Sequence, residues 1–128
     1  MSMDLLAVIS DGMAELGIEY EFGEYTKWPM VYPYFVGQYT ETEPSTEDGL
    51  QESTFMLYGF GRGTWLELEE AKAKIESYFN RIYGKAVTVD DGSAVAVFYG
   101  GALNVPTGDA ELKKIQINLH CKEWRVSE

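Results

Sequence analysis

Hydrophobic residues recur every three or four positions in two stretches of the chain and alternate with polar residues in most of the rest. The first helical pattern covers residues 3–16, and its apolar positions are Leu5, Leu6, Ile9, Met13 and Leu16. Gly17 follows at once, and glycine is the residue that most readily ends a helix. We therefore predict an amphipathic first helix that stops at Gly17.

The second helical pattern covers residues 64–83 and has clearer boundaries. Thr64 and Glu67 stand at the spacing of a capping box, in which each side chain satisfies a free amide of the first turn. Glutamates crowd the first turns, basic residues lie further along, as the helix dipole favours, and Gly84 follows as a left-handed cap. The apolar stripe consists of Leu68, Ala71, Ile75, Tyr78, Phe79 and Ile82.

Shorter apolar segments predict strands over residues 19–25, 34–43, 51–60, 86–89, 94–99 and from 112 to about 126. Between them, polar or proline-rich segments predict an irregular crossing at 27–33, an exposed mobile loop at 43–49, a turn at 90–93 and a loop at 100–109. The expected order is α-β-β-β-α-β-β-β. This order predicts an α+β fold with a mixed or antiparallel sheet and two helices packed on one face. At 128 residues the chain is expected to form a single domain.

Two of the predicted strands carry apolar side chains on both of their alternating sets. Tyr34 and Val36 fall on one set, Phe35 and Tyr39 fall on the other, and the strand over 51–60 repeats the pattern. A helix layer covers only one face of a sheet, and the other face of a small antiparallel sheet is normally polar. Two interpretations stay open: the second face meets another subunit, or the sheet curls and buries both faces within one chain.

Charge narrows the classes of function. The chain has 10 basic and 21 acidic residues, a formal net charge of -11, which disfavours nucleic-acid binding because such a surface repels phosphate. The same charge fits a DNA mimic, a conduit to which DNA must not adhere, or simple solubility. No apolar run is long enough for a membrane span. The single cysteine, Cys121, allows no internal disulfide and fits a reducing compartment such as the cytoplasm.

No pattern of residues points to catalysis. Residues 59–64, with the sequence GFGRGT, lie between a strand and a helix as a phosphate loop does, but the lysine and the spacing of such a loop are missing. His120 and Cys121 are the only residues of their types, and neighbours in a strand point to opposite faces, so they cannot share a metal. We predict no enzyme activity, no metal and no cofactor.

The order of elements and one short segment carry a resemblance. An irregular segment leads into Val31-Tyr32-Pro33-Tyr34-Phe35-Val36, an acidic hairpin follows, then a strand, a helix, a closing hairpin and a last strand. The chain resembles the small tail-terminator, or tail-completion, proteins of long-tailed bacteriophages over nearly its whole length. The resemblance implies a virion protein, built in the host cytoplasm, that forms a homohexameric ring, caps the tail tube and meets the head-completion proteins. It supplies no catalytic residue.

Three hypotheses of function follow. The first is the ring-forming tail terminator, whose subunit or partner contacts are expected at Tyr34, Phe35, Tyr39, Tyr58 and Arg62. The second is a cytoplasmic small-ligand-binding domain with an apolar pocket under the helices, lined by Trp28, Tyr34, Tyr58 and Trp65. The third is an acidic inhibitor that mimics DNA, which net charge alone supports.

Overall fold

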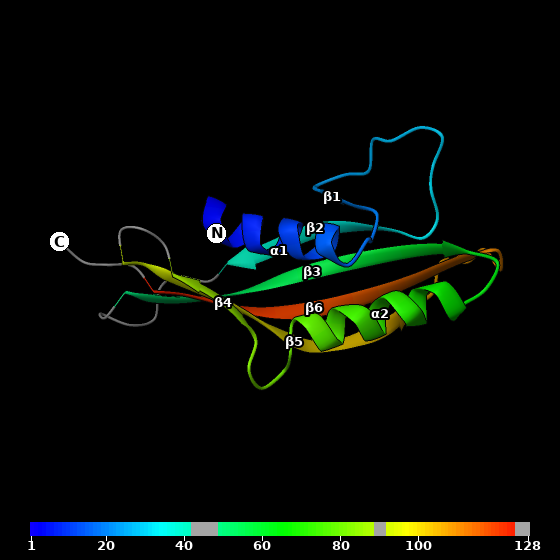
Figure 1. Cartoon of the computed structure of the whole chain (residues 1–128). Coiled ribbons are helices and arrows are strands. Elements are labelled where there is room, and N and C mark those ends of the chain that lie inside the picture. The colour runs from blue at the N-terminus through cyan, green and yellow to red at the C-terminus, as the bar shows by residue number, and fades with distance from the viewer. Residues whose placement is uncertain (42–48, 89–91, 125–128) are drawn as a thin grey trace.

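The fold is a sheet with two helices on one of its faces, as a computed structural model of the chain shows (Figure 1). The structure describes residues 1–41, 49–88 and 92–124. The loop expected over 43–49 therefore lies outside the described residues except for its last glycine. Of the turn expected over 90–93, residues 90 and 91 also lie outside the described residues.

Within the described residues, eight elements follow one another in the order expected from the sequence. Their bounds are α1 Met3–Glu15, β1 Tyr20–Phe22, β2 Tyr34–Glu41, β3 Leu50–Arg62, α2 Leu66–Tyr78, β4 Lys85–Thr88, β5 Ala94–Val105 and β6 Leu112–Trp124. The strands form one six-stranded sheet in the order β1-β2-β3-β6-β5-β4. β1 pairs parallel to β2 and every other neighbouring pair is antiparallel, so the sheet is mixed. The predicted α+β class, with both helices on one face, is confirmed.

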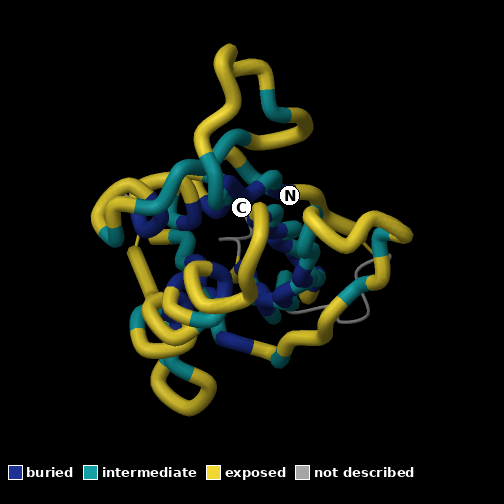
Figure 2. Tube along the Cα trace, turned by 90° about the vertical axis from the view of Figure 1, so that its right-hand side faces the viewer, coloured by how far each residue is buried: buried dark blue, intermediate teal, exposed yellow. Residues whose placement is uncertain are grey.

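The core lies between the helices and the face of the sheet that they cover, called here the inner face. Odd-numbered residues of the long strands point into it, because successive side chains of a strand alternate between faces. Figure 2 shows the buried positions gathered in the middle of the molecule. The fully buried side chains of the sheet and helices include Leu5, Ile9, Met13, Phe35, Phe55, Leu57, Leu68, Ile75, Phe79, Ile115, Ile117 and Leu119.

Helix α1 begins and ends as its sequence predicts. The side chain of Ser2 accepts a hydrogen bond from the amide of Leu5 and so caps the first turn. Gly17 adopts a φ of 71°, and the next amide, of Ile18, donates to the carbonyl of Met13. This pair of features is a Schellman motif, which satisfies the last carbonyls of the helix.

Helix α2 departs from the sequence prediction at both ends. Its N-cap is Trp65 and no side chain caps it, so the predicted capping box of Thr64 and Glu67 is wrong. The helix stops at Tyr78, because the side chain of Asn80 accepts the amides of the next turn and opens a separate bend. Ile82 is consequently 76% exposed and does not belong to the apolar stripe.

Two strands are longer than their patterns predict. β3 runs to Arg62, so most of the glycine-rich segment is strand and not a loop. A Cβ added at Gly59 would stand 2.4 Å from the ring of Phe35, so glycine is required there for close packing. A Cβ added at Gly61 would stand 3.0 Å from Leu68, which would have to shift slightly to admit it. β5 continues to Val105 through a bulge between Tyr99 and Gly101, where the sequence predicted a loop.

Candidate interaction surface on the outer face of the sheet

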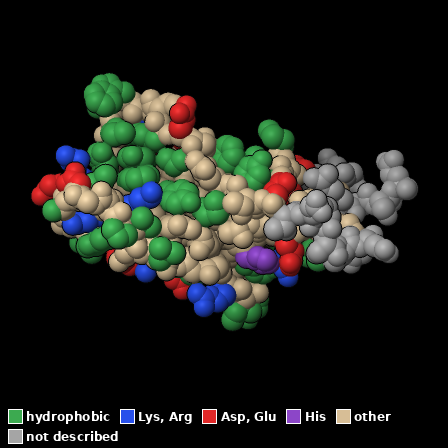
Figure 3. All heavy atoms as spheres, turned by 180° about the vertical axis from the view of Figure 1, so that it is seen from behind, with side chains coloured by type: hydrophobic (Ala, Val, Ile, Leu, Met, Phe, Trp, Pro, Cys, Tyr) green, Lys and Arg blue, Asp and Glu red, His purple; other side chains and the backbone are tan. Residues whose placement is uncertain are grey.

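The face of the sheet opposite the helices, called here the outer face, carries a patch of apolar side chains. Figure 3, which views the molecule from behind, shows them gathered over the half of the sheet away from the undescribed residues, with basic side chains among them. Even-numbered residues of β2, β3 and β6 build this face, among them Tyr34, Val36, Gln38, Met56, Tyr58, Phe60, Lys114 and Gln116. Leu103 of β5 joins them, because the bulge after Tyr99 shifts the alternation of that strand and pairs Leu103 with Gln116. Among the described residues no second layer of elements covers it.

Stacked aromatic rings form the end of this patch. The ring centroids of Tyr34 and Phe60 lie 5.0 Å apart in a stacked arrangement. Tyr25 stacks on the other side of Tyr34 at 4.1 Å, and Tyr32 leans on it at 5.5 Å. Offset and tilted ring pairs at such distances add to the free energy gained from burial alone. The rings pack on one another and leave Tyr34 only 8% exposed.

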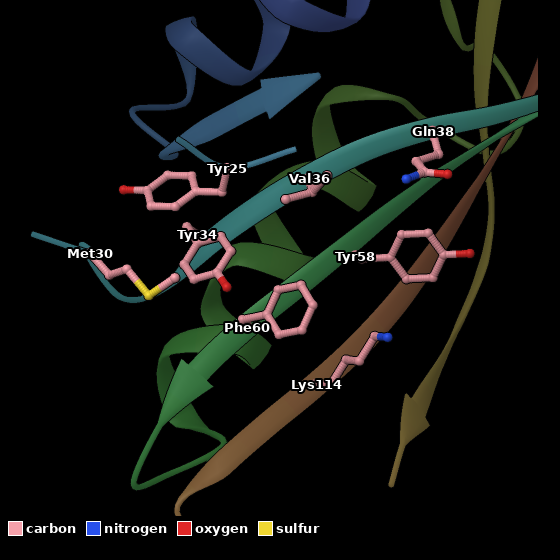
Figure 4. A pocket seen from close by; sticks show the side chains of 8 residues that line it. All are labelled: Tyr25, Met30, Tyr34, Val36, Gln38, Tyr58, Phe60 and Lys114. Atoms are coloured by element: carbon pink, nitrogen blue, oxygen red, sulfur yellow. The ribbon is translucent and has the colours of Figure 1, made fainter. Parts of the chain in front are cut away.

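A groove of about 460 Å³ runs beside these rings (Figure 4). Its lining residues are Tyr25, Met30, Tyr34, Val36, Gln38, Tyr58, Phe60 and Lys114. The ammonium of Lys114 lies 5.0 Å from the ring centre of Tyr58 and 5.3 Å from that of Phe60. No carboxylate among the described residues forms an ion pair with it. The groove thus combines aromatic walls with one cation that the aromatic faces attract.

Charge is distributed very differently on the two faces. The helices carry the acidic residues Asp4, Asp11, Glu15, Glu67, Glu69, Glu70 and Glu76 against Lys72 and Lys74. The outer face carries Arg62, Lys114 and Lys122, and the two acids Glu21 and Glu52 in the described parts of its strands. His120 points to the same face, 3.5 Å from the Glu52 carboxylate. A strongly acidic protein therefore presents one aromatic face that is weakly basic.

The structure brings together three of the five residues expected at a contact. Tyr34, Tyr58 and Arg62 lie on the outer face, and the guanidinium of Arg62 sits 5.9 Å from the ring centre of Tyr32. Phe35 does not belong there. It points to the inner face, has no exposed surface and is part of the core. Tyr39 also points to the inner side, where it is partly exposed and stacks on Phe22 at 6.0 Å.

The pocket expected under the helices is not formed by its predicted residues. Tyr34 and Tyr58 lie on the face that the helices do not cover. Trp28 is 85% exposed, and Trp65 stands at the N-cap of α2. That lining is therefore wrong: the groove that two of these tyrosines do line opens on the other side of the sheet.

His120 and Cys121, the single histidine and the single cysteine of the sequence, point to opposite faces of the sheet, as predicted. Burial raises the pKa of the Cys121 thiol to about 12, and the nearby carboxylate of Glu123 adds to the rise. Such a thiol is not a nucleophile at neutral pH. Among the described residues, no three His, Cys, Asp or Glu side chains lie close enough together to hold a metal ion.

Two groove residues that were not expected at a functional site, Phe60 and Lys114, can be placed from the sequence pattern alone. Phe60 and Lys114 follow directly from the period of two in their strands, once the faces are assigned. Tyr25 and Met30 had no such signal, because their position depends on how residues 23–33 fold back over the sheet.

No protein-family model and no curated protein sequence matches this chain. Neither described helix has the length and apolar composition needed to cross a bilayer.

Proposed function

We propose that this protein is a structural subunit that works by assembly, as a tail terminator that forms a ring on a phage tail tube and joins it to the head. The observation that carries the proposal is the uncovered outer face, with its aromatic patch and its groove. Apolar surface of this kind, on a sheet that normally turns a polar face to water, favours a protein partner.

The composition of the patch supports a protein contact over a contact with solvent alone. Protein interfaces are enriched in tyrosine, phenylalanine, methionine and arginine and depleted in aspartate and glutamate. Met56, Tyr58, Phe60 and Arg62 follow one another on the outer face of β3, whereas the helices carry more acidic than basic residues. In a ring, the outer face would meet the neighbouring subunit, and the acidic helices would be free to face a channel through which DNA slides without sticking.

The experiment is deletion of the gene from the phage or prophage that encodes it, followed by electron microscopy of the particles. The proposal expects overlong tails that carry no heads. Tails of normal length that still join heads would contradict it.

Substitutions on the outer face should reproduce that defect without unfolding the subunit. Val36→Ser and Tyr58→Ser remove half-buried apolar groups of the patch, and Ile82→Ser, at an exposed site away from the sheet, is the matched control. Phe35 is unsuitable for such a series, because its replacement would open a cavity in the core and unfold the protein for an unrelated reason.

A further inference from the structure

Residues 23–33 form an arm that projects from the body of the molecule between β1 and β2 (Figures 1 and 2). The arm exposes three apolar side chains, those of Trp28, Met30 and Val31, and Trp28 is the most exposed large hydrophobic residue described. A single exposed apolar residue is ordinary, but an exposed indole on a short segment with two further exposed apolar side chains is a feature of contact surfaces.

The arm is braced by specific hydrogen bonds. The amide and the hydroxyl of Thr26 both donate to the carboxylate of Glu21, at 2.8 and 2.7 Å. The Tyr25 hydroxyl donates to the Glu19 carboxylate, and the amide of Val31 donates to that same hydroxyl, both at 3.3 Å. Lys27 forms an ion pair with Glu19 at 3.3 Å. These bonds on both sides of the tip hold Trp28 away from the body of its own chain.

The root of the arm is tied to the sheet beside the groove. The amide of Gly23 donates to the Gly37 carbonyl at 2.9 Å, and the side-chain amide of Gln38 donates to the Gly23 carbonyl at 3.3 Å. Tyr25 and Met30 of the arm line the groove, but Trp28 does not. The chain therefore holds an open aromatic groove and an exposed indole close together, and its own arm does not bring the two into contact.

We propose that Trp28 on the arm of one copy occupies the Lys114 groove of a second copy, so that subunits join head to tail. The groove, at about 460 Å³, falls within the size range of sites that enclose a group as large as an indole. An indole is the aromatic group that a cation binds best, so it would add to the two rings already beside the Lys114 ammonium.

Charge is compatible with the same occupant. The arm carries the exposed carboxylate of Glu24 near its start, and the charge of its cation, Lys27, is balanced by the ion pair with Glu19. The groove carries Lys114, and Arg62 lies nearby over the ring of Tyr32. Arm and groove are different patches of the chain, so each contact leaves one arm and one groove free for further copies. This inference rests on the proposed assembly and names the two surfaces that meet in it.

The test is sedimentation equilibrium of the full chain at concentrations up to about 1 mM, a range in which weak association is measurable. The wild type should form species larger than a dimer. Trp28→Ala and Lys114→Glu should each weaken the association about tenfold or more, as truncation of a central anchor does. Matched controls are Tyr83→Ala, at a side chain 82% exposed, and Lys122→Glu, on the same face and strand as Lys114. Both should associate as the wild type does.

Mixing the two defective variants gives a sharper result than either alone. The Trp28→Ala variant keeps an intact groove, and the Lys114→Glu variant keeps an intact arm. An equal mixture should therefore form a one-to-one complex and grow no further. In a chain with Trp65→Phe and Trp124→Phe, association should also shift the emission of Trp28 to shorter wavelength, because the indole leaves water.

Three results would overturn the inference: a wild type that stays monomeric throughout the range, a Trp28→Ala variant that associates as well as the wild type, or a mixture that forms no complex. Binding of the wild type to phosphatidylcholine vesicles that is lost with Trp28→Ala, without self-association, would assign the arm to a lipid surface instead. The assembly proposal is judged separately, by tail length and head joining in particles, and normal function of Trp28→Ala particles would remove the arm contact alone.

Discussion

Gly12 lies in α1 where this helix packs closely against the end of α2, so adding one methyl group by Gly12→Ala tests how the two helices pack. Glycine inside a helix normally costs stability, and Gly12→Ala would gain about 1 kcal/mol from helix propensity alone. In this fold an added Cβ would stand 2.7 Å from Cε1 of Tyr78 and 2.8 Å from Cζ of Phe79. Both distances are shorter than van der Waals contact, so one ring or one helix must move.

The size of the steric cost decides the sign of the effect. Forcing an extra methyl group into a filled core costs about 1 to 3 kcal/mol. Relief is restricted, because Phe79 is fully buried and the Tyr78 hydroxyl donates to the Glu15 carboxylate at 3.0 Å. We therefore expect the steric cost to exceed the propensity gain, with a net loss of up to about 2 kcal/mol. For a chain of this size, each loss of about 1 kcal/mol corresponds to a fall in Tm of roughly 3 to 5 °C.

Urea unfolding of three variants checks this reasoning. Gly12→Ala should lower the midpoint, whereas Ser10→Ala, at an exposed position of the same helix, should leave it unchanged or raise it slightly. In a Phe79→Leu background, which shortens the ring, the penalty of Gly12→Ala should shrink. A Gly12→Ala protein more stable than the wild type would show that the two helices are not packed as described.

Three further predictions follow from the core and from two titratable groups. Ile75→Ala and Phe79→Ala should each lower the free energy of unfolding in urea by about 2 to 5 kcal/mol, because both side chains are fully buried. Lys72→Ala, which loses one surface ion pair with Glu69, should lower it little. Equal effects of all three would mean that a different face of the helix is turned to the core. A thiol reagent at neutral pH should leave Cys121 unmodified in the native protein and modify it after unfolding, since burial raises its pKa; rapid native labelling would contradict its position in the core. The hydrogen bonds from the hydroxyl and the amide of Thr26 lower the pKa of Glu21. This carboxylate therefore adds stability above the usual carboxyl range, and that stability is lost as pH falls through the lowered pKa. Thr26→Val removes the hydroxyl bond alone and should raise the pKa of Glu21 in an NMR titration; an unchanged pKa would exclude the hydroxyl bond as a cause.

The sequence predicts those parts of the fold that depend on local periodicity. The stripe of α1 and its stop at Gly17 are local features, and the structure confirms them. The alternation along β2 and β3 placed Tyr34 and Phe35 on opposite faces, and they do lie on opposite faces. The expectation that both residues lie at one contact is therefore wrong for Phe35, and the alternation in the sequence already places Phe35 on the face opposite Tyr34.

The features that the sequence did not predict depend on residues distant in the chain. Gly59 and Gly61 looked like a loop because glycine is common in loops, but they are strand residues that leave room for side chains of β2 and α2. The early end of α2 depends on the side chain of Asn80, which competed with the helix for backbone amides. The groove depends on the fold-back of the arm, for which the sequence carries no periodic signal.

Hydroxyl-radical footprinting of the isolated subunit and of assembled particles tests most directly whether the outer face of the sheet is the assembly interface. If this face is the interface, Met56, Tyr58 and Phe60, which are partly exposed in the single chain, should lose reactivity on assembly. Leu66 and Ile82, exposed away from that face, should stay reactive. Protection of Leu66 and Ile82, with Met56 and Tyr58 as reactive in particles as in the free subunit, would contradict the account.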